Sequence, residues 1–425
     1  MFADTNSQYH RHELADIKQM RLLSLLIDED ERALGTLIWT ANSRKRMATF
    51  SKQDYEKGLE LHHKSIVIDT LGSAGPRGYS ERMRREADRL LTEGMSGFGI
   101  LTRLNKIRFE DLIRDPAYQS YFVGGRRESG VTAESHSVGG VEDRPWTYEA
   151  AVKGISDTNF LFDNVPDFVK VTKADDIIKA KRFGTILNFQ NSEHFEKDLD
   201  NVEVFYGLGV RVVQLTYNTR NYVGDGCTER TDAGLSEFGV QLVEKMNAIG
   251  MLIDLSHCGY STAADAIQHS AYPVSFTHTF SWSLHRHDRG KKDEQLKAVA
   301  EKGGYIGVVI VPAFLTERPK ATLEDFLDHI DHLTELVGVD HVGVGTDWNG
   351  AMPHKGLADK LNEEMKTLGF RPEHRIDWNT TTEGFEDYGL WPNITVGLVS
   401  RGYSDDEVQK IVGENFLRLF ENVVG

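Results

Sequence analysis

A chain of 425 residues is long enough for one barrel-sized domain with insertions or for two ordinary domains. Its 49 basic and 65 acidic residues give a net charge of −16, which argues against nucleic-acid or anionic-membrane partners, because both need a basic surface. Two cysteines exclude a disulfide scaffold, and the sequence shows neither a signal-like stretch nor about 18 consecutive apolar residues. We therefore expect a cytoplasmic protein that binds small molecules or like subunits.

The first part of the chain predicts helices around one strand. Apolar residues recur at helical spacing over 11–60, so residues 1–60 are predicted as a helical extension that precedes a main domain at 61–425. Ser65–Asp69 is a short apolar run rich in β-branched residues and is followed by turn-forming residues, which predicts the first strand. The charged residues 77–125 predict a helical insertion after it.

Seven more strands are predicted beyond the insertion, with amphipathic helical stretches between several of them. They are Gly130–His136, Gly184–Gln190, Val210–Tyr217, Met251–His257, Val274–His278, Tyr305–Val311 and His341–Asp347. Alternating strands and helices favour a parallel sheet, and eight such units favour a closed barrel over an open sheet. The sequence thus predicts an α/β fold of the TIM-type (β/α)8 barrel class, with one closing helix over 404–424.

Three predicted strands end in residues that carry chemistry. His257 and His278 end two successive strands, and Asp347 ends the last one. Because the carboxyl ends of all strands converge on one face of a parallel barrel, these side chains can meet there around a metal ion or a substrate. The structural alternative is that the histidines are hydrogen-bonded core residues and that Asp347 caps a helix or pairs with a cation.

From about Ser65 onward, the sequence resembles the membrane (renal) dipeptidases, which are zinc-dependent barrel enzymes of the amidohydrolase type. The segments that carry the resemblance are Gly224–Gly239, Asp254–His257, the strand ending in His278, Arg289–Glu294, Gly343–Asp347, Arg401–Ser404 and Gly413–Leu417. The resemblance implies a barrel fold, hydrolysis of a dipeptide-like substrate and a homodimer.

The residues that would hold metal match this family only in part. Its members bind two zinc ions through a His-x-Asp pair after the first strand, a bridging glutamate and two later histidines. The later histidines are kept as His257 and His278, but the pair falls on Leu71 and Ser73 and the glutamate on Gln190. Leucine cannot ligate, serine rarely does, and a neutral amide does not offset the repulsion between two dications. The sequence therefore predicts one zinc ion or none.

Roles for the other site residues follow from the same resemblance. It aligns Tyr217 with a substrate-contacting histidine of the family and Arg289 with its substrate-binding arginine. We predict that Arg289 clamps a substrate carboxylate and that Gln190 and Tyr217 donate hydrogen bonds to the substrate carbonyl. Asp347 or a neighbour would accept a proton from water activated by a metal ion at the two histidines. The expected reaction is cleavage of the amide bond in a dipeptide or an N-acyl amino acid.

A second class of function stays open. A barrel without metal would bind a small carboxylated ligand, or would run acid–base chemistry such as an elimination or isomerisation. The groups available for this are His257, His278, Asp347 and Tyr217. Metal content separates the two hypotheses.

Some further residues have open roles. Glu193 and His194 lie just beyond Gln190 and are candidates to replace the missing ligands. Cys227 and Cys258 are candidate ligands too, although buried, inert thiols fit them better. Preference for a substrate side chain is expected to depend on the loops around 74–130 and 350–395.

Overall fold

The computed structural model describes residues 50–72, 78–139, 146–179, 182–348, 350 and 352–425. Contacts divide the chain into two units, Met1–Tyr55 and Glu56–Gly425. Residues 1–49, which make up most of the predicted helical extension, lie outside the described residues. The described part of that extension lies mostly in helix α2 (Lys52–Lys64), which continues past the predicted boundary at residue 60.

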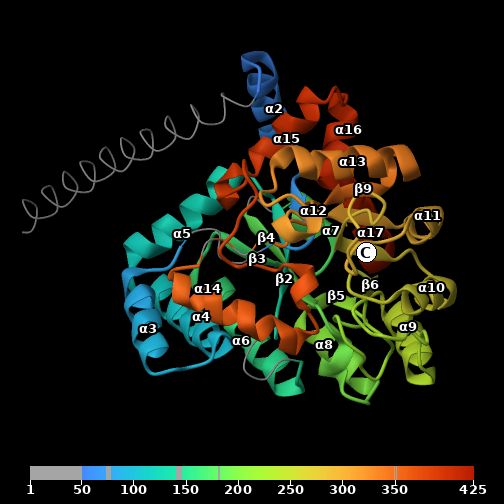
Figure 1. Ribbon diagram of the computed structural model, residues 1–425, viewed down its shortest axis with the longest axis horizontal. Helices are drawn as coiled ribbons and strands as arrows, with labels where there is room; N and C mark the ends of the chain where they lie inside the picture. The colour runs from blue at the N-terminus through green and yellow to red at the C-terminus, as the bar shows by residue number, and fades with distance from the viewer. Residues whose placement is uncertain (1–49, 73–77, 140–145, 180–181, 349, 351) are drawn as a thin grey trace, which may run out of the picture. The chain divides into compact units, whose positions relative to one another are not determined.

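Eight parallel strands form a barrel in the unit Glu56–Gly425, with helices outside them (Figure 1). In sheet order they are β1 (Ile68–Asp69), β2 (Ala133–Ser137), β4 (Phe183–Phe189), β5 (Val210–Gln214), β6 (Leu252–Asp254), β7 (Ser275–Thr279), β8 (Tyr305–Val308) and β9 (Val342–Val344). The Thr70 N–H donates to the Val344 carbonyl oxygen at 3.0 Å, which joins the first strand to the last. The predicted fold class and all eight predicted strands are confirmed.

One further strand was not predicted. β3 (Phe168–Val171) pairs with β4 and lies off the barrel order. Phe168 and Val171 are buried, whereas the two residues between them are partly exposed. Four residues are too few for this pattern to be separated from a loop by periodicity alone.

The predicted insertion after β1 is helical. It consists of α3 (Glu81–Thr92), α4 (Gly97–Arg114) and α5 (Pro116–Ser129). Each helix begins at a capping side chain, because Ser80, Ser96 and Asp115 accept hydrogen bonds from backbone N–H groups of the first turn.

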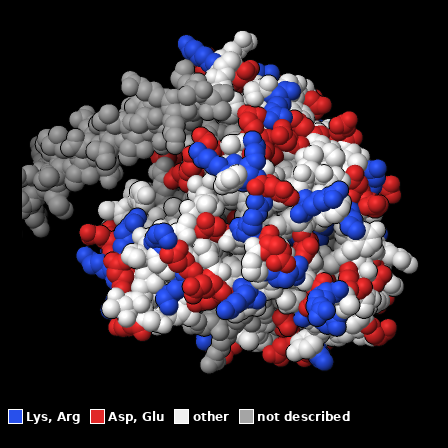
Figure 2. All heavy atoms as spheres, viewed as in Figure 1, with Lys and Arg blue, Asp and Glu red and all other residues white. Residues whose placement is uncertain are grey.

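The other helices lie between the strands or follow the last strand. They are α6 (Tyr148–Asn164), α7 (Ala174–Lys179), α8 (Asp200–Leu208), α9 (Glu237–Ile249), α10 (Tyr260–His269), α11 (Asp293–Glu301), α12 (Pro312–Leu315), α13 (Leu323–Val337), α14 (Lys355–Glu364) and α15 (Pro392–Ser400). Within the described ranges, no helix is both long enough and apolar enough to span a membrane. Figure 2 shows acidic and basic side chains interspersed over the visible face.

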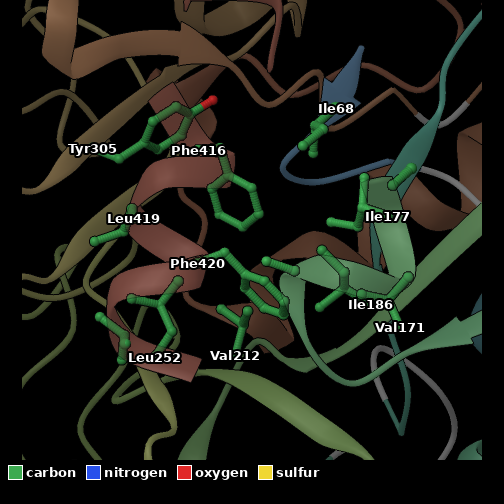
Figure 3. Close-up of a cluster of buried hydrophobic side chains, with 13 residues drawn as sticks. Ile68, Val171, Ile177, Ile186, Val212, Leu252, Tyr305, Phe416, Leu419 and Phe420 are labelled. Carbon is green, nitrogen blue, oxygen red and sulfur yellow. The ribbon is translucent and has the colours of Figure 1, made fainter. Parts of the chain in front are cut away.

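The closing helix fills the amino-terminal end of the barrel. α16 (Asp405–Gln409) continues through a π-helical turn, Lys410–Glu414, into α17 (Asn415–Val424). A Cβ at Gly413 would overlap the Ile66 carbonyl oxygen, so only glycine allows this close approach to β1. The α17 side chains pack in one cluster with strand residues (Figure 3), among them Phe416, Leu419, Phe420, Ile68, Ile186, Val212 and Leu252. This core leaves the opposite end of the barrel for chemistry.

Candidate functional site

Four of the predicted site residues line one pocket at the carboxyl ends of the strands. Gln190 follows β4, Tyr217 lies just beyond β5, His257 just beyond β6 and Asp347 just beyond β9. The pocket has a volume of about 140 Å³. His278, in β7, joins the group through His257. The structure therefore brings together side chains that are up to 157 residues apart in the sequence, as expected at the mouth of a parallel barrel.

The centre of the site is a pair of buried imidazoles. The Nε2 atoms of His257 and His278 are 2.9 Å apart, and both rings are almost fully buried. Tyr217 stacks on the His257 ring with 4.1 Å between the ring centroids. The pair therefore presents two nitrogen atoms toward a single point.

The hydrogen-bond network fixes the protonation of His257. Its Nδ1 is 2.6 Å from the Asn218 Oδ1. The Asn218 amide nitrogen donates to the Leu368 carbonyl oxygen at 2.8 Å, which identifies the other amide atom as the oxygen. Because that oxygen can only accept, His257 carries its proton on Nδ1, and its Nε2 keeps a lone pair.

His278 is held in the same tautomer by a different partner. The Thr277 hydroxyl donates to the Asp254 Oδ2 at 2.8 Å. The same hydroxyl oxygen lies 2.8 Å from the His278 Nδ1 and accepts the ring proton. The His278 Nε2 therefore carries a lone pair as well. Polar partners that orient a histidine through its second nitrogen are typical of metal-binding imidazoles.

Both imidazoles are neutral in this environment. Burial, together with the nearby Arg289 guanidinium, lowers the pKa of His257 and of His278 well below the usual value. Two lone pairs that face each other at 2.9 Å repel unless a cation or a proton lies between them. The donor set thus fits one cation held by two nitrogen atoms.

Leu71 and Gln190, which the resemblance places at the other half of a binuclear site, offer no charged ligand. Leu71 is buried at the carboxyl end of β1, where its carbonyl oxygen accepts from the Asp347 N–H at 2.8 Å. Gln190 offers a neutral amide, and its Nε2 donates to the Ser137 hydroxyl at 2.8 Å. Ser73 lies outside the described residues. Within the described ranges, no group of three or more His, Cys, Asp or Glu side chains is arranged to hold a metal ion.

Asp347 is a partly buried residue with an unusual backbone. Its φ of 50° is in the left-handed region, which aspartate and asparagine tolerate better than most residues. Burial raises the pKa of Asp347 to about 7; Arg289 opposes the rise and Asp69 adds to it. A group that titrates near neutral pH suits acid–base catalysis.

Tyr217 contributes a hydroxyl group to the pocket, next to Asp347. Burial, followed by the negative charge of Asp347, raises the pKa of its hydroxyl. The hydroxyl therefore stays protonated at neutral pH and can donate a hydrogen bond to a substrate oxygen.

Arg289 is fully buried behind the histidine pair. Its Nη1 donates to the Ser256 carbonyl oxygen, and its Nη2 donates to the His278 carbonyl oxygen at 3.2 Å. The described residues that line the pocket do not include it. Its role as a clamp for a substrate carboxylate stays a prediction.

The four residues with open roles lie apart from the histidine pair or are protonated. The His194 Nδ1 is 2.9 Å from the Thr147 carbonyl oxygen, and Glu193 accepts from the Asn191 side chain at 3.0 Å. Burial raises the pKa of Cys227, and it raises that of Cys258 to about 11. Both thiols therefore stay protonated at neutral pH.

Sequence reasoning missed two parts of the site. Asn218, Thr277 and Asp254 orient the two rings, although each lies within three residues of a predicted site residue. The apolar side of the pocket was also missed; its members include Phe314, Trp348, Met365, Leu368, Phe370 and Trp378. The sequence analysis indicated this apolar side only through the expectation that the loops around 350–395 shape the pocket.

Known proteins are similar to this chain in sequence. The family described as "Membrane dipeptidase (Peptidase family M19)" matches residues 129–367 and 376–424. Dipeptidase tcpJ of Claviceps purpurea is 31% identical over 258 residues, which cover 59% of this chain and 54% of that relative. Dipeptidase verJ of Clonostachys rogersoniana is 26% identical over 250 residues, 58% of this chain and 57% of the relative. The chain thus matches a little over half the length of these curated relatives.

Solved structures agree on the fold. An amidohydrolase from Pseudomonas aeruginosa is 31% identical, with a TM-score of 0.68 over 87% of this chain and 99% of that one. A metallo peptidase from Rhodobacter sphaeroides, liganded with a phosphinate mimic of the dipeptide L-Ala-D-Ala, is 20% identical. Its TM-score is 0.58, it covers 74% of this chain and 96% of its own, and it supports the fold alone. With its family match over most of the barrel, the chain belongs to the membrane dipeptidase family, peptidase family M19.

Proposed function

We propose that this protein is a metal-dependent hydrolase that cleaves the amide bond of a dipeptide or an N-acyl amino acid, using one divalent ion instead of two. The observation that carries the proposal is the pair of Nε2 atoms of His257 and His278, 2.9 Å apart and both aprotic in the neutral rings. Zinc accepts imidazole nitrogen ligands, and catalytic zinc sites keep an open position for water or substrate. Family membership and the named dipeptidase relatives support the reaction class.

The chain's own residues divide the work of hydrolysis. A divalent ion at the two histidines would supply Lewis-acid polarisation and a lowered pKa of water. Asp347 would take a proton from the attacking water and return it to the leaving amine, since its pKa is about 7. Tyr217 and Gln190 would donate hydrogen bonds to the oxygen on which negative charge develops. Arg289 would clamp a substrate carboxylate. We also propose that the protein is a homodimer and acts in the cytoplasm.

A metal-free function is the second candidate, because the same 2.9 Å contact between the Nε2 atoms is also the length of a hydrogen bond with one shared proton. In that case His257, His278, Asp347 and Tyr217 would bind a carboxylated ligand or run acid–base chemistry. The two candidates differ in whether a metal ion is required.

Metal content and chelator sensitivity together test the proposal. The protein would be purified without a histidine tag or added metal, analysed by plasma mass spectrometry and assayed for dipeptide hydrolysis. We expect about one ion per chain and loss of activity with a chelator. Two ions would contradict the reduced site. No ion after supplementation, or full activity in metal-free protein, would overturn the metal-dependent function in favour of the second candidate.

A further inference from the structure

The pocket has two chemically different parts. Gln190, Tyr217, His257 and Asp347 supply polar groups on one side. The other side is formed by aromatic and aliphatic side chains, among them Phe314, Trp348, Met365, Leu368, Phe370 and Trp378. A pocket that combines a few polar groups with a broad apolar wall is suited to a ligand that has polar groups at one end and a large apolar group at the other.

Part of this apolar wall belongs to a segment that the family match leaves out. Residues 368–375 lie between the two matched ranges, and they contribute Leu368 and Phe370 to the pocket. Both side chains are buried, with 5% and 6% of their surfaces exposed. Leu368 and Phe370 are therefore the part of the wall that the shared family pattern does not specify.

The segment is firmly attached to the site. Gly369 has a φ of +84°, and a Cβ there would come within 2.6 Å of the Thr219 side chain. The Asn218 amide donates to the Leu368 carbonyl oxygen at 2.8 Å, and Arg371 donates to the Thr228 carbonyl oxygen at 2.8 Å. Because Asn218 also orients His257, the same side chain contacts both the apolar wall and the histidine pair.

Two indole N–H groups in the same wall lack partners. Among the described residues, the Nε1 atoms of Trp348 and Trp378 are buried and have no hydrogen-bond acceptor. Trp348 is 8% exposed, and both residues line the pocket. A buried donor without an acceptor is unfavourable, so the packing of the rings, and not a hydrogen bond, holds these two indole groups in the wall.

We propose that this wall selects substrates that carry a bulky aromatic or aliphatic side chain next to the amide group to be cleaved. A large apolar side chain would fill the space against Leu368 and Phe370, whereas a methyl group would leave that surface in contact with water. The proposal names the substrate class for the proposed hydrolase and rests on that function for the presence of an amide.

Calorimetric binding to the full chain, treated with a chelator, tests the proposal, because the metal-free protein would bind these N-acyl amino acids without hydrolysing them. The probes are N-acetyl-L-phenylalanine and N-acetyl-L-alanine, which differ only by the phenyl ring. We expect the phenylalanine probe to bind at least about tenfold more tightly, since even smaller apolar differences give about 10- to 200-fold discrimination in a fitted pocket. Equal affinities would overturn the proposal.

Variants assign the preference to the wall. Phe370→Ala should bring the affinity ratio close to one, and Phe370→Leu, which keeps an apolar side chain, should retain most of it. Phe160→Ala removes a phenylalanine that is 46% exposed on α6 and should change nothing. An unchanged ratio in both Phe370 variants would refute the assignment.

The experiments can distinguish failure of this inference from failure of the proposed function. A chain that prefers the phenylalanine probe but hydrolyses no amide would sustain this inference and refute the hydrolase. A chain that hydrolyses alanine and phenylalanine dipeptides equally well would do the reverse.

Discussion

His257 and His278 meet through their Nε2 atoms at 2.9 Å, and each ring is oriented through its Nδ1 by a polar neighbour. Asn218 holds the first ring, and Thr277, itself bonded to Asp254, holds the second. The two lone pairs are thus directed at the same point in a buried, neutral environment. This relationship makes the pair the natural target of the first test.

Replacing one ring should remove the metal ion. In His278→Ala a single imidazole remains, so metal content is expected to fall from about one ion per chain toward none, with an unchanged circular dichroism spectrum. His341→Ala is the matched control, because His341 bonds to the Gly304 carbonyl oxygen at 2.9 Å and lies before β9, away from the pocket. Plasma mass spectrometry measures both variants. Equal metal content in the two would refute ligation by His278.

Asn218 should control metal affinity without contacting the metal. Asn218→Leu removes the acceptor of the His257 Nδ1 proton, so the ring loses its fixed tautomer. Loss of such an orienting partner typically weakens metal binding by about 10- to 100-fold. Asn218→Asp keeps an oxygen at this position and is expected to retain the affinity. Competition with a chromophoric chelator gives both values, and equal weakening in the two variants would show that the bond to Leu368 matters instead.

More of the fold than of the site could be predicted from the sequence. The strands depend on residues that are neighbours in the sequence, whereas the site depends on contacts between residues that are far apart in it. Each barrel strand is a short local segment, and His257, His278 and Asp347 stand at the ends of the segments predicted as strands. The contact from Asn218 to the Leu368 carbonyl oxygen joins residues 150 positions apart. Neither residue type nor spacing indicates it. Likewise, Tyr388 and Trp391 are buried and donate hydrogen bonds to the Asp69 carboxylate, which lies 319 and 322 positions away in the sequence.

Asp347 should make stability and activity respond to pH in opposite directions. Burial raises its pKa to about 7, so the folded protein binds this proton more tightly than the unfolded chain does. The resulting stabilisation is fully present below about pH 4, the unfolded pKa, and is lost as the pH rises through 7. Catalysis needs the carboxylate, so kcat/KM should rise over the same range.

Asp347→Asn isolates this effect. Asparagine tolerates the positive φ and cannot ionise, so the metal-free variant should gain thermal stability relative to the native protein at pH 8 more than at pH 4. Its kcat/KM should fall by about 10²- to 10⁴-fold, the usual contribution of a general base. Thermal unfolding at both pH values gives the comparison. A stability difference that does not change with pH would mean that Asp347 is already ionised at low pH.

Restoring the missing half of the family's metal site should raise the metal content from about one ion to two. Leu71→His, Ser73→Asp and Gln190→Glu together return an imidazole and two carboxylates, and the glutamate supplies the charge that offsets repulsion between two dications. Gln190→Glu alone is the control and should stay near one ion, because Leu71 still offers no donor. The family match begins at residue 129, so the alignment of Leu71 and Ser73 rests on the first strand alone. A folded triple variant that binds no additional ion would therefore place the family's His-x-Asp pair elsewhere in this chain.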